Sequence, residues 1–548
     1  MTARTAPSTF PVFLQRAAHC FETLPELRQG ASKLRQVAES SNQPFNLAVV
    51  GRMKVGKSTL INSLVGRELA VADVEEATAT VNWFCHGTGA QTAQFIVHWK
   101  DGRTESFPVE RLKGEWTGKS AEVKARAEKA ARLQLFADLP RLREVQIIDT
   151  PGSGAAVEAH ERGIKEFLNP DVFKLSAAEG NKADAIVYVV APVGRESDVE
   201  NLELFHSGRL TNSGPYNSVC VVHKWDCLDA ADPFGEARRK GERLFEQLSG
   251  MVAKVIPVSG PIALAARAAP DDFFERLLKV TSSASESDFE NALKIERRWK
   301  QDPGRAEILA LFPLPWASFT LIARQLRGIR VGDIATAKAR CEDYSRIREL
   351  EEFIEERFFS QAAIIKKRQI LEKTEQVYVP SIKTLELEVN RLADDAENGR
   401  KGAKLLHGEP QLSQWMLDKS EDWQRRQEST EAELISLDRE WGDHRAELDG
   451  LQMDLEISRE MDVQPDLFPQ HDKHRIRSLC DHLATPQRRS QMGSAQIATL
   501  QEIRTMIDFY RSKANRSSRK NQRLFEHVVK RLESACELLT SKLNSLLL

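Results

Sequence analysis

With 548 residues, the chain exceeds what one hydrophobic core serves, so we expect at least two domains. The formal charge of −2 gives no overall basic field, which argues against nucleic acid as a partner. Seven scattered cysteines, none in a C-x-x-C pair, exclude a disulfide framework and a zinc site and indicate reduced cytosolic thiols.

The first predicted element is a helix over about residues 10–39, where apolar residues recur at helical intervals. Its apolar stripe needs a partner. We expect that partner to be the final helix, about residues 520–547, because neither helix has one nearby in the sequence. No signal pattern precedes this helix, and no stretch of the chain reaches the roughly 18 apolar residues of a membrane span.

A phosphate-binding loop follows. Residues 51–58 read G-R-M-K-V-G-K-S and match the pattern G-x-x-x-x-G-K-[ST] at every required position. A β-branched run over 46–50 precedes the loop and a helical pattern over 58–65 follows it, as a phosphate cradle at a helix N-terminus requires. A chance glycine turn is the alternative, and this context argues against it.

Each loop residue has an expected role. Lys57 would reach the β- and γ-phosphates, and the Ser58 hydroxyl would bind Mg²⁺. The residues expected to contact the nucleotide here are Gly51, Lys54, Val55, Gly56, Lys57, Ser58 and Thr59.

Residues 76–80 read E-A-T-A-T, in a segment where a Mg²⁺-coordinating threonine is expected. Thr78 is our first choice and Thr80 our second, and an ordinary threonine at a strand edge remains the alternative. Further on, we expect a hairpin over 92–112 around Lys100-Asp-Gly102 and a helix over 121–133.

A second site motif is V-Q-I-I-D-T-P-G at residues 145–152, an apolar strand that runs into D-x-x-G. Asp149 would hold Mg²⁺ through a water, and the Gly152 N–H would face the γ-phosphate. Ser153 follows the glycine, where a glutamine would be expected to orient the attacking water.

The guanine motif is expected after the predicted strands 185–190 and 218–222. Residues 223–226 read H-K-W-D, against the usual [NT]-K-x-D. Asp226 would accept two hydrogen bonds from guanine and Lys224 would cover the base, while His223 leaves open how this loop is tied to the P-loop. A surface loop with a stray Lys-x-Asp is the alternative. After a strand at 252–258, Ser259 and Gly260 stand where a backbone N–H would meet the guanine O6.

Alternating strands and helices predict a doubly wound, mostly parallel sheet with these loops at its carboxyl edge. Residues 261–345 are mostly helical, and the apolar stretch 308–326 is interpreted as core packing. Long charged helices follow from Ser345, with a heptad-like apolar seam over 434–455 and further stripes over 497–510 and 525–546. They predict an elongated antiparallel bundle.

The tip of that bundle is expected at residues 464–489, between two long arms. Leu467 and Phe468 lie there between two prolines, beside a group of basic residues. This combination could bind anionic headgroups weakly. The alternative is a solvated connector whose two apolar side chains cap the core of the bundle itself.

These motifs together resemble a bacterial member of the dynamin superfamily of large GTPases. The resemblance covers about residues 45–365 by motif and the remainder only by architecture. It implies an α/β P-loop GTPase domain over 45–345, joined to a helical neck and stalk formed by an N-terminal helix (1–44) and residues 346–548. It further implies GTP or GDP and Mg²⁺ as ligands and a homodimer formed through the GTPase heads.

The same resemblance implies GTP hydrolysis coupled to stalk movement that acts on a membrane or a partner protein. Lys54 occupies the position where guanylate-binding proteins carry an arginine that swings onto the phosphates, so Lys54, Lys57 and Thr78 are the candidate catalytic residues. A solvated lysine at position 54 is the alternative. The expected location is cytoplasmic or peripheral at the inner membrane. A nucleotide-controlled scaffold with slow hydrolysis and a co-encoded partner is the second hypothesis, and an ATPase a weaker third.

Overall fold

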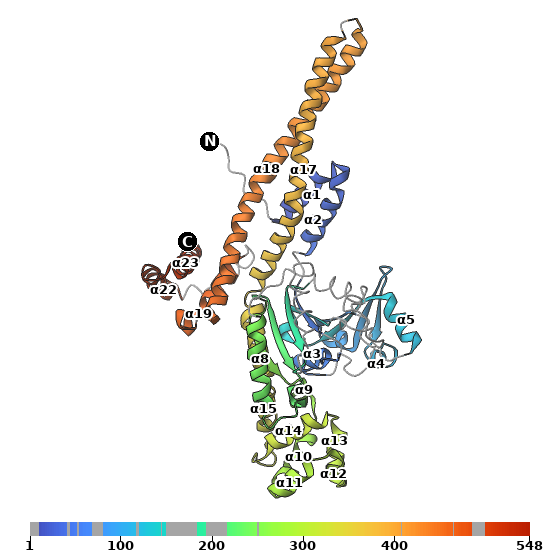
Figure 1. Cartoon of the computed structure of the whole chain (residues 1–548), viewed down its shortest axis with the longest axis vertical. Coiled ribbons are helices and arrows are strands. Elements are labelled where there is room, and N and C mark those ends of the chain that lie inside the picture. The colour runs from blue at the N-terminus through green and yellow to red at the C-terminus, as the bar shows by residue number, and fades with distance from the viewer. Residues whose placement is uncertain are drawn as a thin grey trace. The chain divides into compact units, whose positions relative to one another are not determined.

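The computed structural model describes residues 10–40, 44–51, 54–67, 81–116, 120–143, 145–149, 183–192, 216–248, 251–406, 408–463, 465–484 and 499–547. The chain divides into two compact units, Pro44–Ala362 and the remainder, Met1–Gln43 with Ala363–Leu548. We call the first the head unit and the second the helical unit. Figure 1 shows their elements.

The head unit is built on a nine-stranded sheet with the order β4-β3-β5-β2-β6-β1-β7-β8-β9. The sheet extends from β1 on both sides, with β6 on one side and β7, β8 and β9 on the other, and these strands all run parallel to β1. Every residue of β1 is buried, as its apolar run requires. The predicted doubly wound, mostly parallel sheet is therefore confirmed. The strands are β1 (Phe45–Gly51), β2 (Val81–His86), β3 (Gln94–Trp99), β4 (Thr104–Pro108), β5 (Ala130–Ala137), β6 (Val145–Asp149), β7 (Ala185–Val190), β8 (Ser218–His223) and β9 (Val255–Val258).

Two parts of the sheet differ from the prediction. The helix expected over 121–133 ends at Lys129, and β5 begins at the next residue. The buried residues of β5 alternate along the strand, at Leu133, Leu135 and Ala137. This period of two was missed because the strand follows directly on a helical pattern. Strand β2 was not anticipated at all.

The helices of the head unit include a lobe with its own aromatic core. Phe273, Trp299 and Phe319 are fully buried there, and the last lies in the stretch interpreted as core packing, which confirms that interpretation. The helices are α3 (Lys57–Val65), α4 (Glu110–Glu115), α5 (Ala121–Lys129), α8 (Pro233–Leu248), α9 (Gly260–Ala268), α10 (Asp271–Ser283), α11 (Glu286–Leu293), α12 (Glu296–Trp299), α13 (Pro303–Leu311), α14 (Trp316–Leu326), α15 (Ile334–Ser345) and α16 (Ile347–Ile354).

No single helix in the described segments has the length and apolar composition of a membrane span. Helices α13 and α14 meet that criterion only as a pair, and a bend of 108° separates them. The head unit also continues to Ala362, so α16 and the π-helical turn η5 (Glu355–Phe359) belong to it, beyond the boundary at 345 suggested by the sequence.

Arg267 on α9 joins four helices of the head unit. Its guanidinium donates to the carbonyl of Ser63 near the end of α3 (2.7 Å). It also forms ion pairs with Glu342 on α15 (2.6 Å) and Glu351 on α16 (2.7 Å). The side chain is largely buried, so these contacts hold the four helices together away from solvent screening.

The helical unit is organised around the antiparallel pair α17 and α18 (Figure 1). Bonds join the two helices along their length: Ser413 Oγ donates to the Ala403 carbonyl at one end, and Arg445 pairs with Glu375 further along. The predicted seam over 434–455 is largely buried on α18, including Leu437, Leu448 and Leu455. The helices are α1 (Phe10–Glu22), α2 (Arg28–Ser40), α17 (Ala362–Leu405), α18 (Pro410–Val463), α19 (Gln470–Ala484), α22 (Leu500–Ala514) and α23 (Arg519–Leu547).

The predicted position of the bundle tip is wrong. Asp481 on α19 accepts a hydrogen bond from the N–H of Ala363, at the start of α17 (3.2 Å). The described part of that segment, residues 465–484, therefore lies at the end of the α17–α18 pair where α17 begins. The hairpin tip is the opposite end, where Leu405 ends α17 and Pro410 begins α18. The prolines in the sequence showed where helices end, but they did not show which of these breaks forms the tip of the hairpin.

Two side chains of the rejected tip, Phe468 and Arg477, are used inside the helical unit. Phe468 is buried against the rings of Tyr510 and Phe525, so it caps the core, as the alternative interpretation held. Arg477 is buried and donates to Ser458 Oγ (3.0 Å). Arg488 and Arg489 lie outside the described residues.

The expected pairing of the first and final helices is also wrong. The chain breaks near Pro25, and α1 lays its apolar stripe on α17 and α18: the Phe13 ring lies 5.5 Å from Tyr378 and 6.2 Å from Trp441, between ring centroids. The stripe of α23 packs instead on α22, which precedes it directly in the sequence. Each stripe thus had a partner that apolar spacing alone could not specify.

Phe13→Ala should destabilise the helical unit strongly. Removing a fully buried ring from this aromatic cluster should lower the free energy of unfolding by about 3–5 kcal/mol. Val12→Ala, at the exposed neighbouring position, is the control and should shift it by less than about 0.5 kcal/mol. Urea denaturation followed by circular dichroism measures both, and equal midpoints for the two variants would contradict the packing described.

Candidate nucleotide-binding site

The candidate site lies where parallel strands of the head unit end. Strands β6, β1, β7, β8 and β9 run side by side in one direction, so their carboxyl ends meet at one edge of the sheet. The P-loop follows β1, Asp149 ends β6, and the H-K-W-D loop begins at the last residue of β8. The topology thus brings together motifs that are far apart in the sequence.

The P-loop has the backbone shape that its glycines permit. Gly51 has a φ of +154°, and a Cβ on it would lie 2.4 Å from the carbonyl oxygen of Val189. Lys57 is buried at the start of α3, and its ammonium donates to the Gly51 carbonyl (3.1 Å). This hydrogen bond joins the start of the P-loop to the N-terminus of α3, where the loop ends.

Asp149 and Lys57 share this buried environment. Burial raises the pKa of Asp149 to about 6, and the charge of Lys57 opposes that rise. Burial also lowers the pKa of Lys57, and Asp149 opposes that shift in turn. Each group is thus penalised by desolvation and partly relieved by the other.

The donor set around Asp149 suits a hard cation. Its Oδ2 accepts a hydrogen bond from Ser58 Oγ (3.3 Å), and its buried Oδ1 has no hydrogen-bond partner among the described residues. A hydroxyl and a carboxylate are the oxygen ligands that Mg²⁺ prefers. These residues fit the cation expected from the sequence, because a water of the cation would donate to the orphaned oxygen and the positive charge would favour the charged carboxylate.

Asn82 is a site neighbour that the sequence analysis missed. It is buried on β2, directly opposite Asp149 in the antiparallel β2–β6 register, and its side chain helps to lower the pKa of that carboxyl. A polar residue at the second position of a strand whose next three residues are apolar was the available signal.

Asp226 is presented as a guanine-reading carboxylate should be. It is buried, Ser318 on α14 donates to its Oδ2 (2.5 Å), and its Oδ1 has no hydrogen-bond partner in the described part of the chain. An unsatisfied buried carboxylate oxygen is costly unless a ligand donates to it. Ser318 was also missed, although a lone serine in an apolar stretch was a visible signal.

Three other residues of this edge have hydrogen-bond partners within the protein that the sequence did not predict. The Ser259 N–H donates to the Ser345 carbonyl (3.0 Å), and the Gly260 N–H donates to His223 Nε2 (3.1 Å). The sequence suggested that a backbone N–H here would meet the guanine O6, but both N–H groups donate to protein atoms instead. Lys224 has a left-handed backbone (φ 62°), and its ammonium donates to the Lys54 carbonyl (2.8 Å).

The remaining predicted residues are distributed as follows. Lys54 is exposed, with φ 62°, Val55 is buried, and Thr59 is half-buried in the first turn of α3. Thr78, its alternative Thr80, and Gly152 lie outside the described residues.

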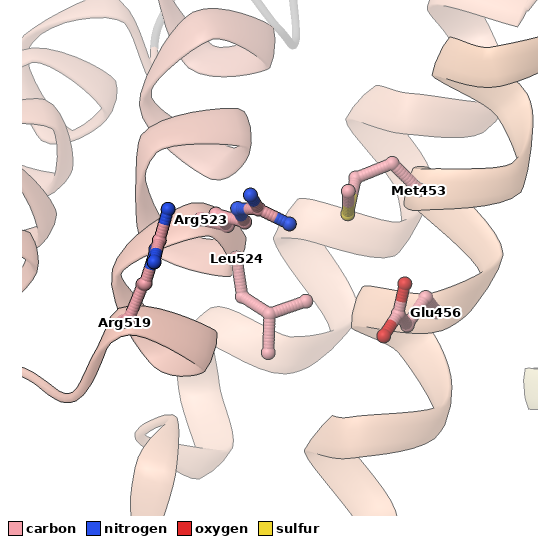
Figure 2. Close-up of a pocket in the computed structure, with 5 residues that line it drawn as sticks. All are labelled: Met453, Glu456, Arg519, Arg523 and Leu524. Atoms are coloured by element: carbon pink, nitrogen blue, oxygen red, sulfur yellow. The ribbon is translucent and has the colours of Figure 1, made fainter.

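The helical unit holds a separate hollow of about 530 Å³ between α18 and α23, shown in Figure 2. Met453 and Glu456 line it from α18, and Arg519, Arg523 and Leu524 line it from α23. None of these residues belongs to a nucleotide motif. The candidate nucleotide site is therefore the carboxyl edge of the sheet and not this hollow.

The fold and its loops define a P-loop nucleotide-binding domain of the GTPase kind. Residues 47–225 match the sequence model described as "Dynamin family". The chain is 28% identical over 300 residues to "Isoniazid-induced protein IniC" of Mycobacterium tuberculosis, covering 53% of this chain and 57% of that protein. It is 25% identical over 205 residues to "Dynamin-like protein 2" of Campylobacter jejuni, covering 37% of this chain and 29% of that protein.

Among solved structures, one described as "An oligomerised bacterial dynamin pair provides a mechanism for the long-range sensing and tethering of membranes" aligns with 98% of this chain and 88% of its own. Its TM-score of 0.34 and identity of 14% are too low to carry an argument. The family match and the two relatives support identification as a bacterial dynamin-like GTPase, which confirms the resemblance seen in the sequence. The chain spans less than two thirds of the length of either relative.

Ser318→Ala should weaken guanine nucleotide binding. The Asp226 carboxylate would lose the donor that orients it, and a hydrogen bond to a charged group contributes about 1.5–3 kcal/mol, so we expect roughly a tenfold or greater loss of affinity for fluorescent GDP. Thr320→Ala on the same helix removes a hydroxyl that donates to the Ala317 carbonyl within α14, and it should change affinity little. Equal affinity of S318A and wild-type protein would show that Ser318 does not position Asp226.

Proposed function

We propose that this protein binds GTP with Mg²⁺ and hydrolyses it, and that the GTPase heads of two copies come together to do so. The observation that carries the proposal is the pair of buried carboxylates at one sheet edge, Asp149 and Asp226, each with an oxygen left without a protein partner in the described residues. One fits a cation beside the phosphate loop and the other fits the donors of guanine. The family match supports the same ligand.

The roles of the residues follow from their chemistry. Lys57 supplies a buried positive charge to the β- and γ-phosphates, while Ser58 directly and Asp149 through a water would hold Mg²⁺. The cation, when bound, neutralises negative charge that develops on the phosphate oxygens. Asp226 selects guanine, because adenine offers no matching donors and would leave the buried carboxylate unsatisfied. Thr78 would add a further ligand to Mg²⁺, and the Gly152 N–H would face the γ-phosphate.

Lys54 is the proposed source of additional charge during hydrolysis. Ser153 stands where a water-orienting glutamine would be expected, so the chain needs another way to stabilise the reaction. The exposed side chain of Lys54 emerges from a left-handed position at the mouth of the P-loop, where it could offset charge between the phosphates. Contact between two heads would exclude water from this charge and strengthen it.

GTP turnover per molecule should rise steeply with protein concentration, because dimerised heads are the proposed active form. Lys57→Ala should lose nucleotide binding, since no other described group replaces its buried charge at the loop. Lys54→Ala should lower turnover by about tenfold to a hundredfold while leaving GDP affinity near wild type, as expected for a charge used mainly in the transition state. Phosphate release measured over a range of protein concentrations tests this, and a flat, near-zero rate would favour the nucleotide-controlled scaffold.

We further propose that the hairpin tip, formed by Leu405 at the end of α17 and residues 410–417 at the start of α18, contacts a lipid surface. Four exposed large apolar side chains lie close together in sequence there, the last of them Leu417: Leu405 is 84% exposed, Trp415 55% and Leu412 51%. Tryptophan suits the boundary between water and lipid, since its ring is apolar and its N–H is polar. A patch of this size would bind weakly and would need several copies to act together.

Leu405→Asp combined with Trp415→Asp should abolish sedimentation with liposomes. Charged side chains at both positions would make entry into the headgroup region costly. Leu387→Asp is the matched control, because that residue is exposed on α17 away from the turn. The test uses anionic liposomes at low salt with GTP present. Unchanged recovery of the double variant, or no sedimentation of wild-type protein, would point to a protein partner at the hairpin tip instead.

A further inference from the structure

The imidazole ring of His223 lies buried between two loops of the candidate site. Its Nδ1 is 2.9 Å from the carbonyl oxygen of Val55 in the P-loop, and its Nε2 is 3.1 Å from the backbone nitrogen of Gly260 at the start of α9. Because the Gly260 N–H is a donor, Nε2 must accept and Nδ1 must carry the proton that is donated to Val55. The two contacts select one neutral tautomer of the ring.

The space around the ring is also specific. A Cβ added to Gly56 would lie 2.4 Å from Nδ1, and a Cβ added to Gly260 would lie 2.4 Å from Nε2. Real Cβ contacts are never this short, so a side chain at either position would displace the ring. Two glycines in separate loops therefore leave room for this one imidazole.

Lys224 makes a second link between the same loops. Its ammonium donates to the Lys54 carbonyl at 2.8 Å, so consecutive residues of the H-K-W-D loop bind consecutive carbonyls of the P-loop. The two links differ in burial, since Lys224 is half-exposed and His223 is fully buried. A buried hydrogen bond is costly to leave unmade, so His223 is the firmer of the two.

We propose that His223 is a positioning residue that holds the phosphate-binding loop, the guanine loop and the start of α9 at a fixed spacing, so that both ends of a guanine nucleotide are bound together. This inference rests on the proposed nucleotide-binding function. The sequence left open how the H-K-W-D loop is tied to the P-loop, because histidine replaces the usual Asn or Thr. In this chain the histidine makes that link through both of its ring nitrogens. Without the ring, the two loops would have to be ordered by the ligand itself, which lowers affinity.

Burial keeps the ring neutral. Burial lowers the pKa of His223 to about 4, with Asp226 opposing and Lys224 reinforcing the shift. The groups that meet the ring from the P-loop and α9, Val55, Gly56 and Gly260, do not titrate. As pH falls below about 6.5, the unfolded chain takes up a proton that the folded ring refuses, so stability decreases from about pH 6.5 towards pH 4.

Three substitutions at position 223 separate the two contacts. Asn can keep a donor near Nδ1 for Val55, Gln can keep an acceptor near Nε2 for Gly260, and Ala keeps neither. In the full-length protein, His223→Ala should weaken fluorescent GDP binding by about tenfold or more at pH 7.5, with H223N and H223Q in between. His98→Asn, at a half-buried histidine on β3, is the matched control and should bind like wild type.

A second substitution tests the contact with α9 directly. Gly260→Ala should weaken GDP binding in the wild-type background, because its methyl group would push the ring away from Nε2 contact. In H223N, whose side chain stops short of that space, the same change should cost much less. An equal loss in both backgrounds would overturn the positioning role, as would an H223A protein with wild-type affinity.

The pH dependence gives a readout that a merely space-filling residue would not move. Between pH 7.5 and pH 5, the melting temperature of nucleotide-free wild-type protein should fall more than that of H223N, which has no proton to take up at this position. Identical declines would count against the neutral ring. If wild-type protein itself binds no GDP, the proposed function fails and this inference fails with it, whereas binding by both wild type and H223A rejects only the inference.

Discussion

The head unit depends on a buried pair of opposite charges. Lys57 and Asp149 are enclosed at the end of the central strands, where desolvation disfavours the charged form of each and the neighbouring charge offsets part of that cost. The surrounding structure serves this arrangement. The fully buried strand β1 excludes solvent, Gly51 turns the chain back over the lysine, and α3 brings Ser58 against the carboxylate. A ligand that brings phosphate and a cation would give Lys57 an anionic partner and would satisfy the Asp149 oxygen that has no hydrogen-bond donor among the described residues.

The parts of the site that the sequence predicted are those set by local chain geometry. The P-loop, the aspartate that ends β6 and the H-K-W-D loop are each a strand followed directly by its functional residues, so neighbours in the sequence are sufficient to place them. Ser318 and Asn82 were missed because they reach the site from other elements, α14 and β2. The fate of the Ser259 and Gly260 N–H groups also depended on distant partners, Ser345 and His223.

The helical unit shows the same limit more strongly. Apolar spacing identified the buried seam of α18, because the period of a helix fixes which residues share a face. It could not decide which stripe covers which, since leucine and phenylalanine stripes are interchangeable partners. The specific choices are made by polar and aromatic contacts, such as Arg16 with Glu433 (2.9 Å) and the stacking of Tyr510 on Phe525. Periodicity does not reveal such pairs, because it shows which residues share a face and not which face of another helix they meet.

Arg267 has a mechanical consequence. One guanidinium joins the end of the helix that begins at the phosphate loop to α15 and to α16, the last regular helix of the head unit. A charged side chain this deeply placed cannot exchange these partners for water cheaply. Any shift of α3 must therefore carry α16 with it or break the ion pairs, so the four helices behave as one lever whose output end is the segment that leads out of the head unit.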